Sequence, residues 1–225
     1  MSLQLITTSD GSHSLLNSEL NETYHSVHGA LRESIHVFIK HGLEFFAGQN
    51  SLVTIHIFEV GFGTGLNALL TLEYALKQGC QIHYTSVEAF PIDHTTARSL
   101  NYPDALSMTD AREYFERLHA APWDVEAVIA PGFTLLKKKT SLQEITLMPE
   151  YDVIYFDAFA PSKQPEMWEL SVLEKVRNAI KPGGVFVTYC AKGQLKRDLK
   201  TLGLVVETLP GPPGKKEMVR GVLQS

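Results

Sequence analysis

The sequence predicts an α/β fold in which a mostly parallel sheet has an antiparallel edge near the C-terminus. From residue 51 onward, short apolar segments alternate with segments of helical periodicity, the pattern of a doubly wound parallel sheet. Segment 151–156 is an almost continuous apolar and aromatic run, which is typical of a strand buried on both faces of such a sheet. Segments 204–209 and 217–223 follow each other without a helical segment between them, and they predict an antiparallel pair at one edge.

The composition fits one globular domain with a short attachment. The chain has 225 residues, of which 44% are hydrophobic, and no run of about 18 apolar residues predicts a membrane-spanning helix. The N-terminus lacks the basic start and apolar core of a signal peptide. Cys80 and Cys190 form no CxxC pair, and the nine histidines include no HExxH motif. We therefore expect a cytoplasmic protein without membrane contact and without a metal site.

The first 50 residues predict an N-terminal extension ahead of the alternating part. Residues 3–8 fit a short strand, and the sequence Asp-Gly-Ser at 10–12 is a turn signal. Apolar residues recur at helical spacing over 30–46, although Gly42 interrupts the pattern, and Gly-Gln-Asn at 48–50 marks the exit. We expect two units, an extension over 1–50 that covers the cofactor site and a main domain over 51–225.

The main domain has a regular order of expected elements. We expect strands at 53–60, 81–87, 151–156, 184–190, 204–209 and 217–223, and helices at 66–77, about 92–100, about 110–119, about 166–180 and 194–202. Segment 121–132 contains two prolines and is expected to be partly loop, and segment 133–139 fits a strand or one arm of a hairpin. Ligands bind at the carboxyl ends of the strands in open α/β sheets, so the segments after these strands are the candidate site.

A glycine-rich turn joins the first expected strand of the main domain to its helix. Gly61, Gly63 and Gly65 permit a tight turn and a close approach of a ligand to backbone N–H groups. A GxGxG pattern alone fits both dinucleotides and S-adenosylmethionine. Leu66 stands where a dinucleotide-binding turn prefers Gly or Ala, and Glu59 suits a cationic ligand better than a phosphate. Both details favour S-adenosylmethionine; the alternative is a turn that binds no ligand.

Two further acids stand at the ends of expected strands. Glu88 ends the second strand of the main domain, where a carboxylate can accept hydrogen bonds from both ribose hydroxyls of an adenosine ligand, in NAD as well as in S-adenosylmethionine. Asp157 ends the strand at 151–156, and we expect it at the mouth of a pocket. The alternative is that Asp157 caps the helix near Glu166, but Pro161 and Pro165 separate the two.

Charge is unevenly distributed along the chain. The formal net charge is −5. Residues 181–225 contain eight basic and three acidic residues, or +5, and the remainder contains 12 basic and 22 acidic residues, or −10. Such asymmetry fits a local surface for an anionic partner on an acidic body. The alternative is a solvated helix face followed by a loose C-terminus.

Several longer motifs occur in one order. They are EVGFGTGLNALLTL, SVEAFP, YDVIYFDAFAPSKQPEMW, TYCAKGQLKRDLKTLG and PGPPGKKEMVRG, preceded by DGSHSLLNSELNETYHSVHGALRES. Together they resemble the methyltransferase domain of the MnmC family, which modifies the wobble uridine of tRNA, and the resemblance covers nearly the whole chain. Bifunctional members of that family carry a second, FAD-dependent oxidase domain, and this chain resembles a stand-alone methyltransferase form.

The resemblance implies a class I, Rossmann-like methyltransferase that depends on S-adenosylmethionine. The implied substrate is the primary amine of 5-aminomethyl-uridine, or its 2-thio form, at the tRNA wobble position, and the implied product is the 5-methylaminomethyl derivative. The implied partners are the anticodon region of tRNA and a separate FAD-dependent oxidase.

The resemblance also implies roles for individual residues. Gly61, Gly63 and Gly65 would approach the amino-acid part of the donor. Glu59 would lie near the ammonium group of the donor, and Glu88 would hold its ribose.

Further roles fall outside the glycine-rich turn. Asp157 would lie beside the reacting amine, and Tyr24 of the extension would lie over the donor site. One departure concerns the adenine, because many family members have an acid after the third core strand. Here Ser141, or else Thr140, stands in its place, so recognition of the adenine amino group is open.

Basic residues are expected to contact tRNA phosphates, which supply affinity without sequence information. They are Lys163, Lys192, Arg197, Lys215 and Lys216. Trp168 fits either of two roles, stacking on a base or packing in the core. Lys215 and Lys216 fit either the lining of the substrate mouth or solvated surface.

The expected mechanism starts from the protonation state of the amine. An alkylammonium has no lone pair, so it must lose a proton before it attacks the methyl group. Asp157 is expected to orient the amine first, while solvent or a carboxylate of raised pKa takes the proton. Three alternatives stay open: a class I methyltransferase for a small molecule or protein, a dinucleotide-dependent oxidoreductase, and a non-catalytic binding module.

Overall fold

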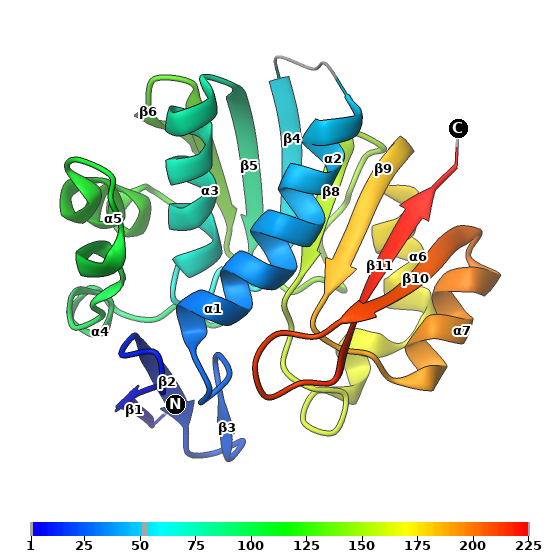
Figure 1. The fold of residues 1–225 in the computed structure, drawn as a ribbon, viewed down its shortest axis with the longest axis horizontal. Helices are drawn as coiled ribbons and strands as arrows, with labels where there is room; N and C mark the ends of the chain where they lie inside the picture. Colours follow the sequence, from blue (N-terminus) through cyan, green and yellow to red (C-terminus); the bar gives the residue numbers. More distant parts are fainter. Residues whose placement is uncertain (1, 51–53, 225) are drawn as a thin grey trace.

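The computed structural model describes residues 2–50 and 54–224, and its centre is one twisted eight-stranded sheet (Figure 1). The strands of this sheet are β4 (Thr54–Val60), β5 (Gln81–Val87), β6 (Glu126–Ala130), β7 (Phe133–Lys138), β8 (Tyr151–Phe156), β9 (Ile180–Thr188), β10 (Leu204–Pro210) and β11 (Glu217–Leu223). Their spatial order is β10-β11-β9-β8-β4-β5-β7-β6. Strands β9, β8, β4, β5 and β7 pair in parallel, whereas β11 is antiparallel to β9 and β10. The predicted parallel sheet with an antiparallel C-terminal edge is confirmed.

Helices cover both faces of the sheet. They are α1 (Ala30–Ser34), η1 (Ile35–Glu44), α2 (Phe45–Gln49), α3 (Leu66–Gln78), α4 (His94–Arg98), η2 (Tyr102–Ala105), α5 (Ala111–Ala120), η3 (Pro165–Trp168), α6 (Leu170–Asn178) and α7 (Gly193–Thr201). Helix α3 and the continuous α1–η1–α2 segment cross one face, and α6 and α7 lie on the other (Figure 1). Among residues 2–50 and 54–224, no helix combines the length and the apolar character that crossing a membrane requires.

Strand β8 shows why its sequence is apolar throughout. All six of its residues are buried. Val153 and Tyr155 belong to the core on the side of η1, while Ile154 and Phe156 belong to the core on the side of α6. Successive side chains of a strand point to opposite faces, so a central strand covered on both faces needs apolar residues at consecutive positions.

The long N-terminal helix crosses the sheet without a break at Gly42. Its middle part, η1, is a π-helix. A Cβ atom at Gly42 would lie 2.9 Å from Cγ2 of Val187 and 3.3 Å from Cε1 of Tyr155. The glycine therefore permits close packing of helix on sheet, and the helix predicted over 30–46 is confirmed.

The N-terminal residues form a separate three-stranded sheet. It consists of β1 (Leu3–Thr7), β2 (His13–Asn17) and β3 (Glu22–Thr23), all antiparallel. This small sheet lies beneath the carboxyl ends of the parallel strands (Figure 1). The strand expected at 3–8 is present, but β2 and β3 were not expected, because their sequences are short and polar.

Other expected boundaries differ from the structure in three places. Segment 121–132 contains strand β6, which forms an antiparallel hairpin with β7. The helix expected at about 166–180 is the short 3₁₀-helix η3 followed by α6, because the extended backbone of Glu169 separates them. Strand β9 begins at Ile180, four residues before the expected 184–190. The first residue expected in the strand at 53–60 lies outside the described residues.

Candidate functional site

A cavity of about 910 Å³ lies at the carboxyl ends of β4, β5 and β8. Its wall combines the N-terminal extension, the glycine-rich turn after β4, and the loops that follow β5, β7 and β8. Of the residues singled out from the sequence, the wall includes Tyr24, Gly61, Gly63, Glu88, Thr140, Ser141, Asp157 and Lys215. The others lie outside it: Glu59, Gly65, Lys163, Trp168, Lys192, Arg197 and Lys216.

The glycine-rich turn has a backbone that suits only glycine. Gly61, Gly63 and Gly65 have φ angles of 88°, 50° and 75°. A Cβ atom at Gly61 would lie 3.0 Å from the carbonyl oxygen of Asp157, and one at Gly63 would lie 3.2 Å from the ring of Tyr24. The missing side chains bring the turn close to the loop after β8 and to the extension, and they leave a backbone cradle for a ligand.

Glu88 holds the turn from the cavity side. Its Oε2 accepts a hydrogen bond of 3.0 Å from the N–H of Gly63, and its Oε1 accepts one of 2.8 Å from the N–H of Phe90. Burial raises the pKa of Glu88 above its usual range. The carboxylate thus faces the cavity from the end of β5, where it has further lone pairs for ligand hydroxyls.

Asp157 faces the cavity from the end of β8. Asn67 Nδ2, at the start of α3, donates a hydrogen bond of 2.9 Å to Asp157 Oδ2. Burial, assisted by the negative charge of Glu33, raises the pKa of Asp157 to about 7. Helices η3 and α6 have no side-chain cap, so Asp157 does not cap either of them.

Glu59 is 1% exposed and lies beneath the turn. Ser86 Oγ of the neighbouring strand donates a hydrogen bond of 2.7 Å to Glu59 Oε2. Burial raises the pKa of Glu59 to about 8, and the charge of Asp157 contributes to the shift. Glu59 therefore lies behind the cavity wall, and its surroundings favour the neutral carboxyl.

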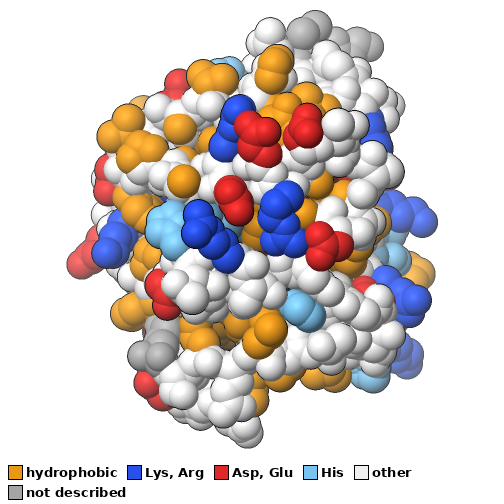
Figure 2. Space-filling model, turned by 90° about the vertical axis from the view of Figure 1, so that its left-hand side faces the viewer, with side chains coloured by type: hydrophobic (Ala, Val, Ile, Leu, Met, Phe, Trp, Pro, Cys, Tyr) orange, Lys and Arg blue, Asp and Glu red, His pale blue; other side chains and the backbone are white. Residues whose placement is uncertain are grey.

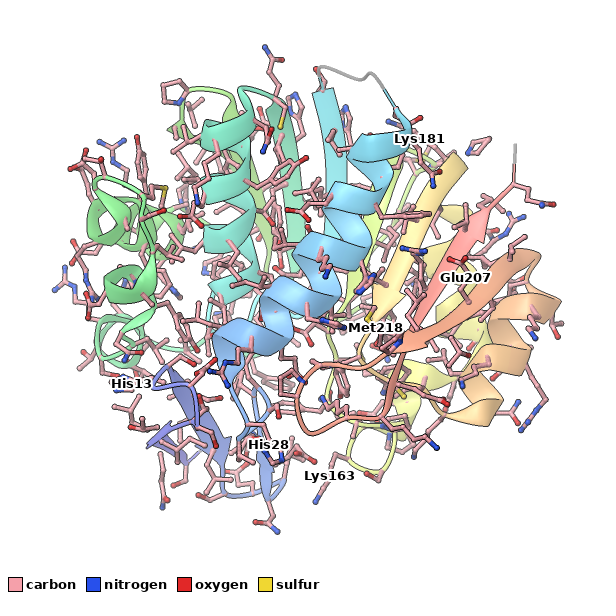
Figure 3. All side chains as sticks on the ribbon, viewed as in Figure 1. His13, His28, Lys163, Lys181, Glu207 and Met218 are labelled. Carbon is pink, nitrogen blue, oxygen red and sulfur yellow. The ribbon has the colours of Figure 1, made fainter. Side chains whose placement is uncertain are left out.

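The N-terminal extension closes one side of the cavity. The Tyr24 ring packs edge-on against Phe159 at 5.1 Å between centroids. Lys163 Nζ, on the loop after β8, donates a hydrogen bond of 2.9 Å to the carbonyl of Leu20. Figure 3 shows His28 on the extension and Lys163 on its loop, both at the cavity end of the sheet. This contact occupies the Lys163 ammonium, which was expected to meet phosphate.

Lys215 enters the cavity wall from the loop between β10 and β11. Its ammonium forms an ion pair with Glu33 of α1 and lies 3.6 Å from the centroid of the Tyr189 ring. The Tyr189 hydroxyl donates a hydrogen bond of 2.8 Å to the carbonyl of Ala158, next to Asp157. The sequence did not indicate Glu33 or Tyr189 as residues of the site, because nothing in it connects α1 with the β10–β11 loop almost two hundred residues away. Asn67 stands in the glycine-rich motif, which was the available signal for it.

The remaining basic residues and Trp168 lie away from the cavity. Lys192, Arg197 and Lys216 are exposed. Trp168 is 8% exposed, its Nε1 donates a hydrogen bond of 2.8 Å to the carbonyl of Phe159, and its ring packs on Phe156. The structure therefore favours the core role of Trp168 over stacking on a base.

Figure 2 shows a different kind of charged face on the side of α4 and α5, where acidic and basic side chains alternate. The basic residues there have acidic partners, in the pairs Arg98–Glu116, Arg112–Asp104 and Arg117–Glu113. Paired charges of both signs do not form a surface for an anionic partner.

The segment expected to meet an adenine has its hydroxyls directed to a carboxylate. Ser141 Oγ donates to Glu144 Oε2 at 3.1 Å, and Thr140 Oγ1 donates to the same oxygen at 3.4 Å. Both residues line the cavity. The hydroxyl oxygens retain lone pairs and can accept from an amino group.

Comparison with known proteins identifies similar sequences over most of the chain. Residues 123–224 match a family described as S-adenosyl-L-methionine-dependent methyltransferase. The chain is 29% identical over 223 residues to the tRNA 5-methylaminomethyl-2-thiouridine biosynthesis bifunctional protein MnmC of Chromobacterium violaceum. The aligned part covers 92% of this chain and 33% of that protein. It is 31% identical over 209 residues to MnmC of Magnetococcus marinus, covering 90% of this chain and 31% of that protein. The chain thus spans about a third of the length of these relatives.

Solved structures share the fold. The crystal structure of MnmC2 from Aquifex aeolicus superposes with a TM-score of 0.81 at 24% identity, covering 100% of this chain and 71% of that one. Spermidine synthase from Thermotoga maritima superposes with a TM-score of 0.52 at 14% identity, covering 98% of this chain and 72% of that one. These matches agree with the expected Rossmann-like, class I methyltransferase architecture.

Proposed function

We propose that this chain, an S-adenosylmethionine-dependent methyltransferase similar to the methyltransferase domain of MnmC, methylates the primary amine of 5-aminomethyl-uridine, or its 2-thio form, at the tRNA wobble position. The product is the 5-methylaminomethyl derivative, whose 2-thio form appears in the name of the MnmC relatives. The observation that carries the proposal is Asp157, a half-buried carboxyl that faces the cavity beside the glycine-rich turn. A carboxylate in this place can bind an amine and direct its lone pair.

The residues of the cavity fit S-adenosylmethionine. The turn at Gly61 and Gly63 leaves a backbone cradle that a Cβ atom would fill, Glu88 offers its carboxylate to ribose hydroxyls, and Tyr24 covers the turn. When bound, S-adenosylmethionine supplies a methyl group that its sulfonium already activates. The protein residues therefore have to hold donor and amine in line and to exclude competing nucleophiles.

Asp157 has two tasks in this mechanism, one positional and one in proton transfer. The acceptor arrives as an ammonium, so one proton must leave before the nitrogen lone pair forms the new bond to carbon. A carboxyl of pKa about 7 is a better proton acceptor for an amine than one of ordinary pKa. Asn67 keeps the carboxyl oriented during the exchange.

The tRNA-binding part of the proposal rests on the basic charge of the C-terminal segment. Lys215 lies in the wall, and exposed Lys192, Arg197 and Lys216 belong to the basic C-terminal segment. Their contacts are with phosphates of the anticodon region, which give affinity that weakens with salt. The extension over 1–50 covers the cofactor site, and 51–225 is the methyltransferase unit. A cytoplasmic location and a separate FAD-dependent oxidase that supplies the amine are also part of the proposal.

The direct experiment is methyl transfer from labelled S-adenosylmethionine to tRNA that carries 5-aminomethyl-uridine, followed by mass analysis of the nucleosides. The expected result is a gain of one methyl group on that nucleoside and a rate that falls with added salt. No transfer, in the presence of measured donor binding, would contradict the proposed substrate. Transfer to a small amine or a protein with no dependence on salt would favour the alternative acceptor classes.

A further inference from the structure

Lys137 occupies a position that the strand pattern reserves for apolar residues. In β7 the buried positions alternate, and they are Phe133, Leu135 and Lys137. Lys137 is 1% exposed, whereas a lysine side chain is almost never fully buried without a partner. Burial lowers the pKa of Lys137 to about 8. The proposed mechanism does not use this cation.

Lys137 lies behind the glycine-rich turn, on the side away from the cavity. Its Nζ donates a hydrogen bond of 2.8 Å to the carbonyl of His119, at the end of α5. It also lies 5.1 Å from the centroid of the Phe62 ring and 4.7 Å from that of the Trp123 ring. Cation–π attraction between a desolvated ammonium and two rings fixes the ring of Phe62, which belongs to the turn.

His119 continues this chain of contacts to the turn itself. Its Nε2 lies 3.1 Å from the carbonyl oxygen of Thr64, and burial lowers the pKa of His119 to about 4. The neutral ring therefore donates a hydrogen bond from Nε2–H to this carbonyl. A Cβ atom at Gly65 would lie 2.8 Å from the same Nε2, so the ring packs directly against the turn. Phe62 and His119 are in edge-to-face contact at 5.4 Å. Both residues between the three glycines are therefore held from behind, while Glu88 holds Gly63 from the front.

We propose that Lys137 and His119 are positioning residues for the cofactor: the Lys137 ammonium fixes the His119 main chain, and His119 holds the glycine-rich turn in the shape that binds S-adenosylmethionine. This role does not depend on the identity of the methyl acceptor. A methionine of similar length in place of Lys137 would pack between Phe62 and Trp123 without the penalty of a buried charge. The methionine would lack the hydrogen bond to the His119 carbonyl, so the substitution should weaken donor binding without lowering the stability of the fold.

The test compares Lys137→Met with Lys138→Met by direct binding of S-adenosylmethionine, thermal unfolding and amide hydrogen exchange, all without acceptor. Lys138 is the next residue on the same strand, and its partially exposed side chain pairs with Asp124 at 3.7 Å. We expect Lys137→Met to keep or raise the melting temperature and to raise the Kd for the donor about tenfold, as for a turn that holds its binding shape one-tenth of the time. The amides of Gly63 and Gly65 exchange faster in this variant before the donor is added, and Lys138→Met changes none of these values.

A second variant covers the case in which Lys137→Met does not fold. His119→Phe keeps a ring against Phe62 and removes the donor to the Thr64 carbonyl. The proposal expects the same rise in Kd and the same faster exchange. An unchanged Kd in the folded variants overturns it, and so does a rise in Kd that Lys138→Met shares. Because the measurements use donor binding alone, they are independent of whether tRNA is the acceptor.

Discussion

Asn67 Nδ2 donates a hydrogen bond of 2.9 Å to Asp157 Oδ2, which joins the start of α3 to the end of β8. Both residues line the cavity, Asn67 from the first turn of α3 and Asp157 from the loop after β8. Hydrogen bonding favours the ionised carboxyl, while burial opposes ionisation. Asn67 therefore orients the carboxyl of Asp157, and burial keeps its pKa close to neutral pH, where the carboxyl can exchange a proton.

Asp157→Asn keeps the size of the side chain and removes its ability to accept a proton from the amine. We expect methyl transfer to fall by about 10²–10⁴-fold, the usual contribution of a positioned acid or base. We expect the Kd for S-adenosylmethionine to stay measurable. The assay is single-turnover methyl transfer with saturating donor, together with donor binding.

Asp152→Asn serves as the control on the same strand. Asp152 is buried in β8, where it accepts a hydrogen bond from the N–H of His56 and pairs with Lys181 at 3.0 Å, away from the cavity. This substitution is expected to lower stability and to leave the turnover of the folded enzyme intact. Full activity of Asp157→Asn would remove Asp157 from the mechanism.

The pH dependence of stability follows from the raised pKa of Asp157. Its folded value of about 7 exceeds the ordinary carboxyl value near about 4, so the folded chain binds the proton more tightly than the unfolded chain. This contribution to stability is complete below about pH 4 and is lost as the pH rises through about 7. We expect urea unfolding of the donor-free protein to show wild type losing stability relative to Asp157→Asn between about pH 4 and 7. The slope approaches about 1.4 kcal/mol per pH unit inside this window and levels off above about pH 7, where neither state holds the proton.

Without donor, the folded protein favours the protonated form of Asp157, and donor binding is expected to favour the ionised form instead. The sulfonium and ammonium of the donor favour the ionised forms of Asp157 and of Glu59, whose pKa is raised to about 8. Binding should therefore release protons near pH 7, and the affinity should rise with pH. Calorimetry in two buffers of different ionisation enthalpy measures the release, and a release equal to zero would contradict the assignment of these two carboxyls.

The sequence predicted the residues of the site that follow local rules. The positions of Gly61, Glu88 and Asp157 at the cavity could be predicted because each directly follows or ends a parallel strand, and the ends of parallel strands meet at one edge of the sheet. Glu33 and Lys137 were missed for a common reason: each is a charged residue at a buried position of its own element, and its partner comes from a distant segment. Hydrophobic periodicity predicts which face is buried, but it does not predict which buried charge has a partner.

The fold was predicted on the same basis. Long apolar strands such as β8 were recognised, whereas β2 and β3 are short, half-polar strands that depend on pairing with each other and with β1. The sequence left open whether 133–139 is a strand of the parallel sheet or one arm of a hairpin, because both have the same alternation of buried and exposed residues. In the structure β7 is both, since it pairs in parallel with β5 and antiparallel with β6.

Gly65→Ala and Gly79→Ala separate backbone strain from contact with the turn. The two glycines cap the two ends of α3 with φ angles of 75° and 65°. A left-handed alanine costs about 1–2 kcal/mol at either end. At Gly65 the methyl group would also meet His119 Nε2 at 2.8 Å, while nothing lies within 4 Å of the corresponding position at Gly79.

We expect Gly79→Ala to lower stability by about that amount and to leave the Kd for S-adenosylmethionine unchanged. Gly65→Ala should lower stability further and weaken donor binding by about tenfold or more, because the turn must move. Chemical denaturation and donor titration of both variants provide the comparison. Equal effects on donor binding would show that strain at the helix end, and not the contact with His119, determines the shape of the turn.

The Glu33–Lys215 pair connects the N-terminal extension with the β10–β11 loop across the cavity wall. Glu33 is buried and Lys215 is partly exposed, and Glu33 Oε1 also accepts a hydrogen bond of 2.9 Å from the N–H of Ser26. Glu33→Gln removes the charge that holds Lys215 in place. We expect a loss of about 2 kcal/mol in unfolding free energy, less than for a fully buried pair because Lys215 retains some water.

The same substitution is expected to raise the KM for the tRNA acceptor about tenfold, because the β10–β11 loop is no longer held in one conformation at the acceptor side. The Kd for S-adenosylmethionine should stay within about twofold, because the glycine-rich turn is unchanged. Lys216→Met, an exposed neighbour on the same loop, should affect neither stability nor donor binding and should only reduce the salt dependence of tRNA binding. In the double variant Glu33→Gln/Lys215→Met, the stability loss should be smaller than the sum of the single losses, since each removes the same ion pair. Strict additivity would show that the two side chains contribute independently, and the loop would then owe its position to other contacts.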